Sequence, residues 1–392
     1  MKKMLVVLMS FVVLISFIVF FSFVSREERK SPVSNTNEAF PGKIAIVTNT
    51  STQNPEEYLS ASVVAEKYGT EKIVHYVFPD NFMNEHDKMV RIMEEIASDK
   101  DIKAIVINSA VYGTNFAVDK LLSSRSDMFI VYCDPAENPA EITARADLVL
   151  SPAELESGPA MVRQAIDMGA KAFVHYSFPR HMSTVMLATR RELIRETCGE
   201  LGIEFIDATA PDPTGNAGME GARKFILEDV PELIEKHGKD TAFFSTNCGM
   251  QPALIRAVVE NGGIFPQPCC PSPFHGFLEA LDIQVENEVA NINYVISETS
   301  RILAERGMTG RLSTWPVSSA VMFAVVGAEY AIKWLNEEVP DEGIDKVILG
   351  DLCREYAKEV YGSEINVSIT SPEENDIAYN NYFMPMLDYI TY

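Results

Sequence analysis

Short apolar runs alternate with amphipathic segments along most of the chain. Runs such as KIAIVTN at 43–49, IKAIVIN at 102–108 and MFIVYC at 128–133 are rich in β-branched residues, as expected for strands that are buried on both faces of a parallel sheet. The segments between them have a helical period, for example at residues 89–96. This alternation predicts an α/β protein in which helices cover both faces of parallel sheets.

A second series of strands, at 172–176, 204–207 and 241–245, follows the first. An ordinary domain has ~100–200 residues, so two series in a chain of 392 residues predict two Rossmann-like lobes. We expect lobe 1 to begin with residues 42–150 and lobe 2 to comprise residues 151–271. Helix starts are recognisable as well, because Asn-Pro-Glu-Glu at 54–57 has the residue types of a capped helix N-terminus.

The first thirty residues differ from the rest. Met4–Val24 carries no charge and is long enough to cross the ~30 Å hydrocarbon layer. A cleaved signal peptide is the alternative, but such peptides have a shorter apolar core and end in small residues, whereas bulky Phe20 and Phe23 lie at the candidate sites. No cysteine precedes Cys133, so a lipoprotein anchor is not expected. We therefore predict a signal-anchor helix within residues 1–30 that holds an extracytoplasmic body at the cell membrane.

The polar stretch that follows, at 31–41, reads as a flexible linker. The chain is 47% hydrophobic, which permits two sizeable cores, and it has a net charge of −23. Nucleic-acid binding needs basic patches that neutralise phosphates, so we expect no nucleic-acid partner.

Cysteine and histidine spacing gives no sign of a metal site. The sequence contains no CxxC, no HExxH and no glycine-rich phosphate loop, so we expect neither metal nor cofactor. We expect the cysteines to be buried free thiols. They are Cys133, Cys198, Cys248, Cys269, Cys270 and Cys353.

Polar side chains follow nearly every predicted strand. Helix capping accounts for many of them, but the carboxyl ends of parallel strands also form the binding crevice of an open sheet. We predict that a cleft between the lobes binds its ligand through residues of these loops. They are Thr48, Asn49, Thr50, Ser109, Tyr112, Asp134, Ser177, Phe178, Arg180, Thr214, Thr246 and Asn247.

Three of these residues have a distinct expected role. Tyr112 and Phe178 offer aromatic rings for stacking, and Arg180 offers a fork of donors to a carboxylate or a hydroxyl-rich ligand. The alternative for Arg180 is an ion pair within lobe 2, with Asp207 or Asp212.

The order of the two series, the start at KIAIVTN, the crossing near 150–153 and the strand TAFFSTN at 241–247 resemble the type I periplasmic-binding-protein superfamily. Within it, HYSFPRHMS at 175–183 and FFSTNCGMQPALI at 243–255 resemble a bacterial family of unassigned function. The resemblance covers roughly residues 42–340. It implies lobes joined by crossover hinge strands and a ligand cleft that closes by hinge motion. It also implies that residues 272–312 return to lobe 1, ahead of a C-terminal helical region and tail at 313–392.

Together these observations predict a membrane-anchored extracytoplasmic solute-binding protein for a small polar organic ligand. Its expected partner is a membrane transporter or a sensor protein. Two alternatives stay open. One is a hydrolase or transferase that uses Cys248 or Asp134 in the same cleft, and the other is a ligand-sensing domain coupled to a signalling partner across the membrane.

Overall fold

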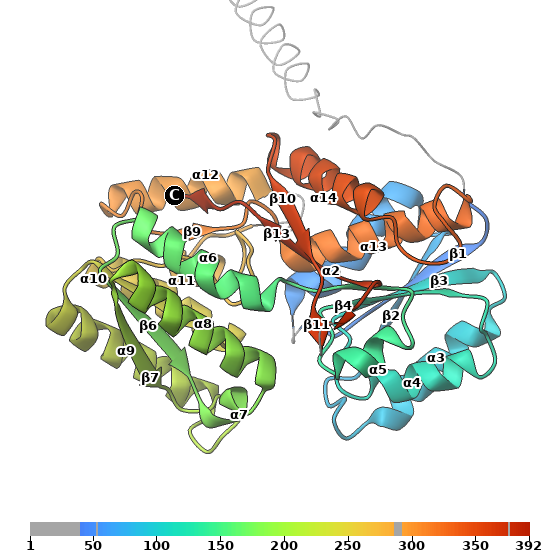
Figure 1. The fold of residues 1–392 in the computed structure, drawn as a ribbon, viewed down its shortest axis with the longest axis horizontal. Helices are drawn as coiled ribbons and strands as arrows, with labels where there is room; N and C mark the ends of the chain where they lie inside the picture. The colour runs from blue at the N-terminus through green and yellow to red at the C-terminus, as the bar shows by residue number, and fades with distance from the viewer. Residues whose placement is uncertain (1–39, 52–53, 286–291, 375–376) are drawn as a thin grey trace, which may run out of the picture. The chain divides into compact units, whose positions relative to one another are not determined.

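The computed structural model describes residues 40–392 except 52–53, 286–291 and 375–376, and the predicted anchor and most of the linker lie outside the described residues. Within the part that is described, no helix is both long and apolar enough to cross a membrane. Two sheets, each with its own helices, form what we call lobe 1 and lobe 2 (Figure 1).

Lobe 1 is built on a seven-stranded sheet with the order β10-β13-β5-β4-β3-β1-β2. Its strands are parallel, except that β10 runs antiparallel to β13. The strands are β1 (Lys43–Thr48), β2 (Ile73–Val77), β3 (Ile102–Asn108), β4 (Phe129–Cys133), β5 (Leu148–Leu150), β10 (Val367–Thr370) and β13 (Tyr382–Leu387).

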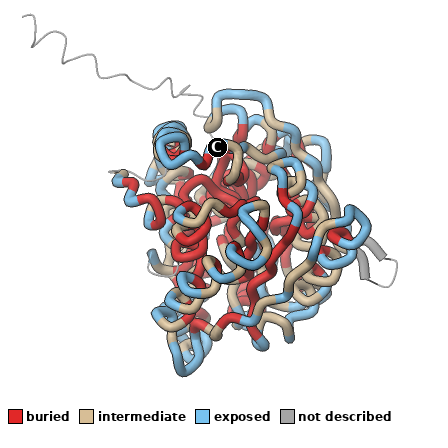
Figure 2. The backbone as a smooth tube through the Cα atoms, turned by 90° about the vertical axis from the view of Figure 1, so that its left-hand side faces the viewer, coloured by how far each residue is buried: buried red, intermediate tan, exposed pale blue. Residues whose placement is uncertain are grey.

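Helices cover both faces of this sheet (Figure 1). Successive side chains of β3 point to opposite faces: Ala104 and Val106 pack in one core with α13, and Ile105 and Ile107 pack in another with α3 and α4. The helices of lobe 1 are α2 (Pro55–Tyr68), α3 (His86–Ser98), α4 (Thr114–Leu122), α5 (Pro139–Thr143), α13 (Ser319–Leu335) and α14 (Lys346–Tyr361). Figure 2 shows the buried residues gathered in the interior and the exposed residues at the surface.

Lobe 2 contains a three-stranded parallel sheet with the order β7-β6-β8. Its strands are β6 (Ala172–Ser177), β7 (Glu204–Thr209) and β8 (Thr241–Ser245). Its helices are α6 (Glu154–Asp167), α7 (Pro179–Met182), α8 (Val185–Leu201), α9 (Gly218–His237), the 3-10 helix η1 (Cys248–Met250), α10 (Gln251–Asn261) and α11 (Phe277–Leu281). The two faces of the sheet again have separate cores.

The remaining elements join the lobes. The chain enters lobe 2 after β5, returns through β9 (Ser313–Thr314) into α13, and places β14 (Ile390–Thr391) antiparallel to β9. α12 (Ile292–Glu305) contributes Val295 to a lobe 1 core and Leu303 to a lobe 2 core. A small hairpin of β11 (Glu373–Glu374) and β12 (Ile377–Ala378) completes the described elements.

Two boundaries differ from the sequence-based expectation. The return to lobe 1 is not made by residues 272–312 as a block, because Phe277, Leu281 and Leu312 pack in the core of lobe 2. Residues 313–392 are not a separate region either, since α13, α14, β10 and β13 complete lobe 1. The physical reason is that β5 pairs with β13, a strand near the C-terminus, so the C-terminal residues are part of the lobe 1 sheet.

A substitution at Gly327 tests how closely α13 packs against the sheet of lobe 1. A Cβ at Gly327 would lie 2.9 Å from Val131 Cγ1, closer than carbon atoms pack, so we expect Gly327→Ala to destabilise the protein by ~1–3 kcal/mol. The control is Gly199→Ala in α8, where a Cβ meets nothing within 4 Å and alanine suits the helix better. Urea denaturation of both variants measures the difference. A Gly327→Ala variant as stable as the control would mean that α13 packs loosely.

Candidate functional site

Neighbouring strands of lobe 1 end in polar residues, as the sequence predicted. Thr48 ends β1, Asn49 follows it, and Ser109 and Asp134 follow β3 and β4. Ser109 and Asp134 have φ values of 63° and 42°, in the left-handed region that non-glycine residues seldom adopt. Such backbone strain is concentrated at functional sites, and here it occurs at two adjacent strand ends.

Glu57 extends this group from the N-terminus of α2. It is 2% exposed, and its Oε1 accepts a 2.6 Å hydrogen bond from the backbone N–H of Asn49. Burial raises the pKa of Glu57 to about 8, and the charge of Asp134 adds to this, while hydrogen bonds from Asn49 and Ser109 oppose it. The buried Oδ1 of Asn49 has no hydrogen-bond partner among the described residues, so the edge retains an unused acceptor.

Asp134 connects this edge with lobe 2. Its side chain remains accessible to solvent, yet the protein around it raises its pKa, first by desolvation and then through the charges of Cys270 and Glu154. Arg190 of α8 acts in the opposite direction. A carboxyl group of lobe 1 is therefore within electrostatic reach of groups of lobe 2 and of the segment between the lobes.

The strand ends of lobe 2 form a second polar group. The hydroxyls of Ser177 and Thr246 lie 3.0 Å apart, and Thr246 Oγ1 is also 3.0 Å from His181 Nδ1. Burial, followed by the charge of Arg180, lowers the pKa of His181 to about 4, so the imidazole is neutral near pH 7. A hollow of about 210 Å³ lies on the β7 side of Ser177 and is lined by Phe178 and Asp207 among others, but not by Thr246 or His181.

Other predicted residues make contacts within lobe 2. The guanidinium of Arg180 donates two hydrogen bonds, of 2.9 and 3.0 Å, to Asp212, which is the alternative role considered for it. Asp212 also accepts from the N–H and the hydroxyl of Thr214. Phe178 is buried in a lobe 2 core, and its ring lies 4.1 Å from that of His181.

The last predicted residues differ in their environment. Thr50 forms a hydrogen bond with Asp80, and Tyr112 is 49% exposed. The hydroxyl of Thr48 is buried and donates to the carbonyl oxygen of Asn49. The structure thus brings Asn49, Ser109 and Asp134 together in lobe 1, and Ser177 and Thr246 together in lobe 2.

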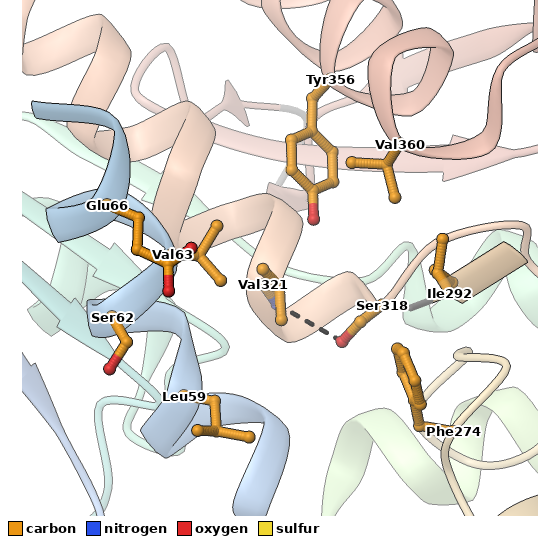
Figure 3. A pocket seen from close by; sticks show the side chains of 10 residues that line it. All are labelled: Leu59, Ser62, Val63, Glu66, Phe274, Ile292, Ser318, Val321, Tyr356 and Val360. Atoms are coloured by element: carbon orange, nitrogen blue, oxygen red, sulfur yellow. Dashed lines mark hydrogen bonds between the residues drawn. The ribbon is translucent and has the colours of Figure 1, made fainter. Parts of the chain in front are cut away.

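A separate pocket lies in lobe 1, along one side of α2. Its volume is about 120 Å³, below the ~300–1,000 Å³ of most small-molecule sites. None of the predicted ligand residues lines it (Figure 3). Its lining residues are Leu59, Ser62, Val63, Glu66, Phe274, Ile292, Ser318, Val321, Tyr356 and Val360.

The cysteines divide into two groups. Cys133, Cys198 and Cys353 are buried free thiols, as expected. The other three are at least partly accessible and meet at one point with His275: they are Cys248, Cys269 and Cys270. Residues that could hold a metal ion are therefore present, contrary to the sequence-based expectation. The vicinal pair and His275 are close in sequence, but Cys248 joins them only through the fold.

This arrangement also bears on the cysteine enzyme considered above. Hydrogen bonds from Cys269 and Cys270 lower the pKa of the Cys248 thiol well below its usual value, which favours a thiolate. His275 Nε2, however, lies 3.6 Å from the Cys269 sulfur, so the nearby base faces a different thiol from the nucleophile.

Comparisons with known proteins agree with this architecture. Residues 42–313 match the family described as "Protein of unknown function (DUF3798)". Two proteins of Treponema pallidum (strain Nichols), each described as "Uncharacterized protein", are 34% and 37% identical over 178 and 172 residues. These matches cover 44% of this chain and 80% of each relative.

Solved structures show the same fold. A Clostridium difficile 630 protein described as a "Putative transcriptional regulator" matches with a TM-score of 0.77 and 23% identity, over 90% of this chain and 100% of that one. A "sugar ABC transporter" protein from Actinomyces odontolyticus ATCC 17982 matches with a TM-score of 0.51 and 11% identity, over 77% of this chain and 86% of that one. The fold is that of the type I periplasmic-binding proteins, which confirms the resemblance.

The buried Glu57 predicts a pH dependence of stability. Its folded pKa of about 8 lies above the ordinary 4.5, so between these values unfolding releases a proton, and stability falls as pH rises through this window. Glu57→Gln keeps the acceptor oxygen without the charge. We expect this variant to lose that pH dependence. Above pH 8 its free energy of unfolding should exceed that of the wild type by more than ~1 kcal/mol.

Urea denaturation across the window measures this effect. Glu94→Gln, on the exposed surface of α3, is the matched control and should follow the wild-type curve. If the free energy of unfolding varied with pH in the same way for the wild type and Glu57→Gln, the pKa of Glu57 would not be raised by folding.

Proposed function

This chain belongs to the DUF3798 family, and we propose that it is a binding protein that takes a small hydroxyl-rich organic ligand between its two lobes. The proposal rests on one observation, the acceptor-rich edge of lobe 1 formed by Asn49, Glu57, Ser109 and Asp134. The fold is consistent with it, since ligands of open parallel sheets bind at the carboxyl ends of the strands.

The chemistry of this edge favours a ligand that donates hydrogen bonds. Carboxyl and amide oxygens accept them, and the buried Oδ1 of Asn49 lacks a partner among the described residues. A hydroxyl group can donate to Asn49 and Asp134 and accept from the hydroxyl of Ser109. Across the lobes, Ser177 and Thr246 supply further hydroxyls.

The same chemistry disfavours an anionic ligand. The guanidinium of Arg180 is engaged by Asp212, and the net charge of −23 repels anions. We therefore leave Arg180 out of the proposed ligand contacts. A binding protein of this kind would deliver its ligand to a membrane transporter or report it to a sensor.

Asp134→Asn tests the ligand site. A panel of monosaccharides and polyols is screened by thermal shift, alongside native mass spectrometry of gently purified protein. Calorimetry with the best binder should show that Asp134→Asn and Asn49→Ala each weaken binding at least tenfold, as a loss of ~1.4 kcal/mol requires. Asp167→Asn, which removes an exposed carboxyl at the end of α6, is the control and should bind as the wild type does.

If no panel member binds and no small molecule copurifies, the proposal fails. Turnover of the bound compound would indicate the enzyme instead.

We also propose that residues 1–30 remain attached and hold the body at the outer face of the cell membrane. The support is the uncharged stretch Met4–Val24, which lacks small residues at a cleavage site. The native protein should fractionate with membranes, and mass spectrometry should detect its N-terminal peptide. A soluble form that begins near Arg26 would contradict this proposal.

A further inference from the structure

Three thiols and one imidazole converge where lobe 2 meets the segment that leads back to lobe 1. Cys248 opens η1, directly after the loop that carries Thr246 and Asn247. The other three residues, Cys269, Cys270 and His275, lie between α10 and α11. One donor atom from each of the four residues lies within 4.8 Å of the other three. No two of these cysteines form a disulfide.

The spacing of these atoms fits the corners of a tetrahedron around one metal ion. The Cys248 sulfur is 3.3 Å from that of Cys269 and 3.5 Å from that of Cys270, and the latter two are 4.0 Å apart. The Cys269 sulfur is 3.6 Å from His275 Nε2. Zinc bonds of ~2.3 Å to sulfur and ~2.0 Å to nitrogen require edges of about 3.8 Å between sulfurs and about 3.5 Å between sulfur and nitrogen. The observed sulfur–sulfur distances bracket the first value, and the sulfur–nitrogen distance of 3.6 Å is close to the second.

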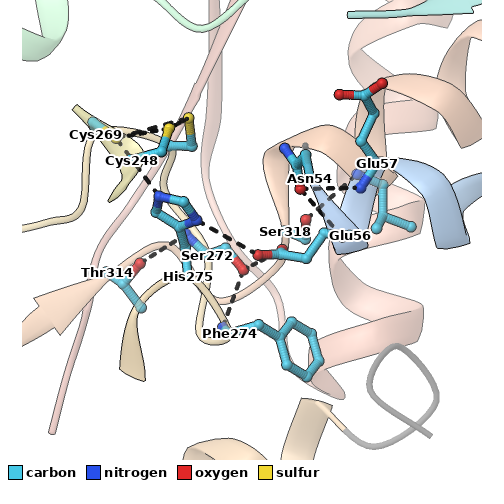
Figure 4. Close-up of polar contacts among 12 residues, drawn as sticks. Asn54, Glu56, Glu57, Cys248, Cys269, Ser272, Phe274, His275, Thr314 and Ser318 are labelled. Atoms are coloured by element: carbon cyan, nitrogen blue, oxygen red, sulfur yellow. Dashed lines mark hydrogen bonds and ion pairs between the residues drawn. The ribbon is translucent and has the colours of Figure 1, made fainter. Parts of the chain in front are cut away.

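A carboxylate stands behind the imidazole, as it does in many zinc sites (Figure 4). His275 Nδ1 faces Glu56 Oε1 at 4.0 Å, on the side of the ring away from the sulfurs. Glu56 is held in turn, because its Oε2 accepts a 2.6 Å hydrogen bond from the Ser272 hydroxyl. The backbone N–H of Ser272 donates to Thr314 Oγ1 at 3.0 Å. His275 therefore has its Nε2 toward the thiol cluster and its Nδ1 toward the Glu56 carboxyl.

We propose that Cys248, Cys269, Cys270 and His275 bind one zinc ion, with Glu56 as a positioning residue behind His275. Three thiols lose their protons to solvent, and neutral Nε2 completes the set of ligands. Sulfur-rich sets with one imidazole suit zinc among the common divalent ions. Four protein ligands leave no open position, so the ion would be structural or carried rather than catalytic.

Such an ion would tie the loop after β8 to the segment between the lobes. It would therefore fix the backbone next to Thr246 and Asn247, which lie on the lobe 2 side of the proposed ligand site. The metal site does not depend on that ligand, and its test does not involve it.

The test uses the full chain, reduced and stripped of metal. Zinc titration against a chromophoric chelator should give one tightly bound ion per chain, and cobalt should give thiolate charge-transfer and tetrahedral d–d bands. Cys248→Ser and His275→Ala should each weaken zinc binding at least 100-fold and alter the cobalt spectrum. Glu56→Gln should weaken it by ~10–100-fold with the tetrahedral bands retained. Cys198→Ala, which removes a buried thiol outside the cluster, is the control and should bind as the wild type does.

Circular dichroism and thermal melting keep the test informative if a variant folds poorly. An ion that binds only the folded protein raises its Tm. Zinc should therefore raise the Tm of the wild type and of Cys198→Ala, but not that of Cys248→Ser, which lacks one ligand of the site. The proposal is overturned if cobalt gives no thiolate band, or if zinc affinity and the cobalt spectrum are the same as for the wild type in both Cys248→Ser and His275→Ala. It is also overturned if the fully reduced cluster binds no zinc and two of its thiols are instead oxidised to a disulfide by dissolved oxygen, which would make it a redox pair.

Discussion

The burial of two adjacent carboxyl groups at the start of α2 is the constraint on which both candidate sites depend. Removing a carboxyl from water is costly, and burial raises the pKa of Glu56 and of Glu57. Asn54 caps the helix, and the helix N-terminus itself favours negative charge. Neighbouring helical residues point ~100° apart, so Glu57 faces Asn49 and Asp134 whereas Glu56 faces Ser272 and His275.

Most of the fold of lobe 1 could be predicted from its sequence, because its central strands are continuous apolar runs. The runs at 43–49, 102–108 and 128–133 became β1, β3 and β4, and polar residues follow them at one edge of the sheet. The Asn54–Glu57 stretch was recognised as a helix start, but its further role was not. The residue type shows that glutamate suits the first turn of a helix. Which residue contacts each carboxyl group, however, depends on segments that the fold brings there from elsewhere in the chain.

Features that depend on distant parts of the chain escaped prediction. β13 contains Pro385, which argues against an interior strand, yet it pairs with both β5 and β10. The thiol cluster has no local spacing motif, because Cys248 joins the vicinal pair only through the β8–η1 turn. The roles of Arg180 and Phe178 were equally undetermined, since both depend on which side chains of lobe 2 lie within reach.

The position of β13 has a consequence for how the protein is made. β5 ends at Leu150 and pairs with β4, but it acquires its second neighbour only when Tyr382–Leu387 has been synthesised, after the strands of lobe 2. Until then the edge of β5 presents unpaired backbone groups to any other nascent strand. During translation the three strands of lobe 2 can pair before the sheet of lobe 1 is complete, because they all derive from one continuous stretch. The core of lobe 2 is completed only by the C-terminal Tyr392. The net charge of −23 opposes association of such chains during the interval in which the larger sheet is unfinished.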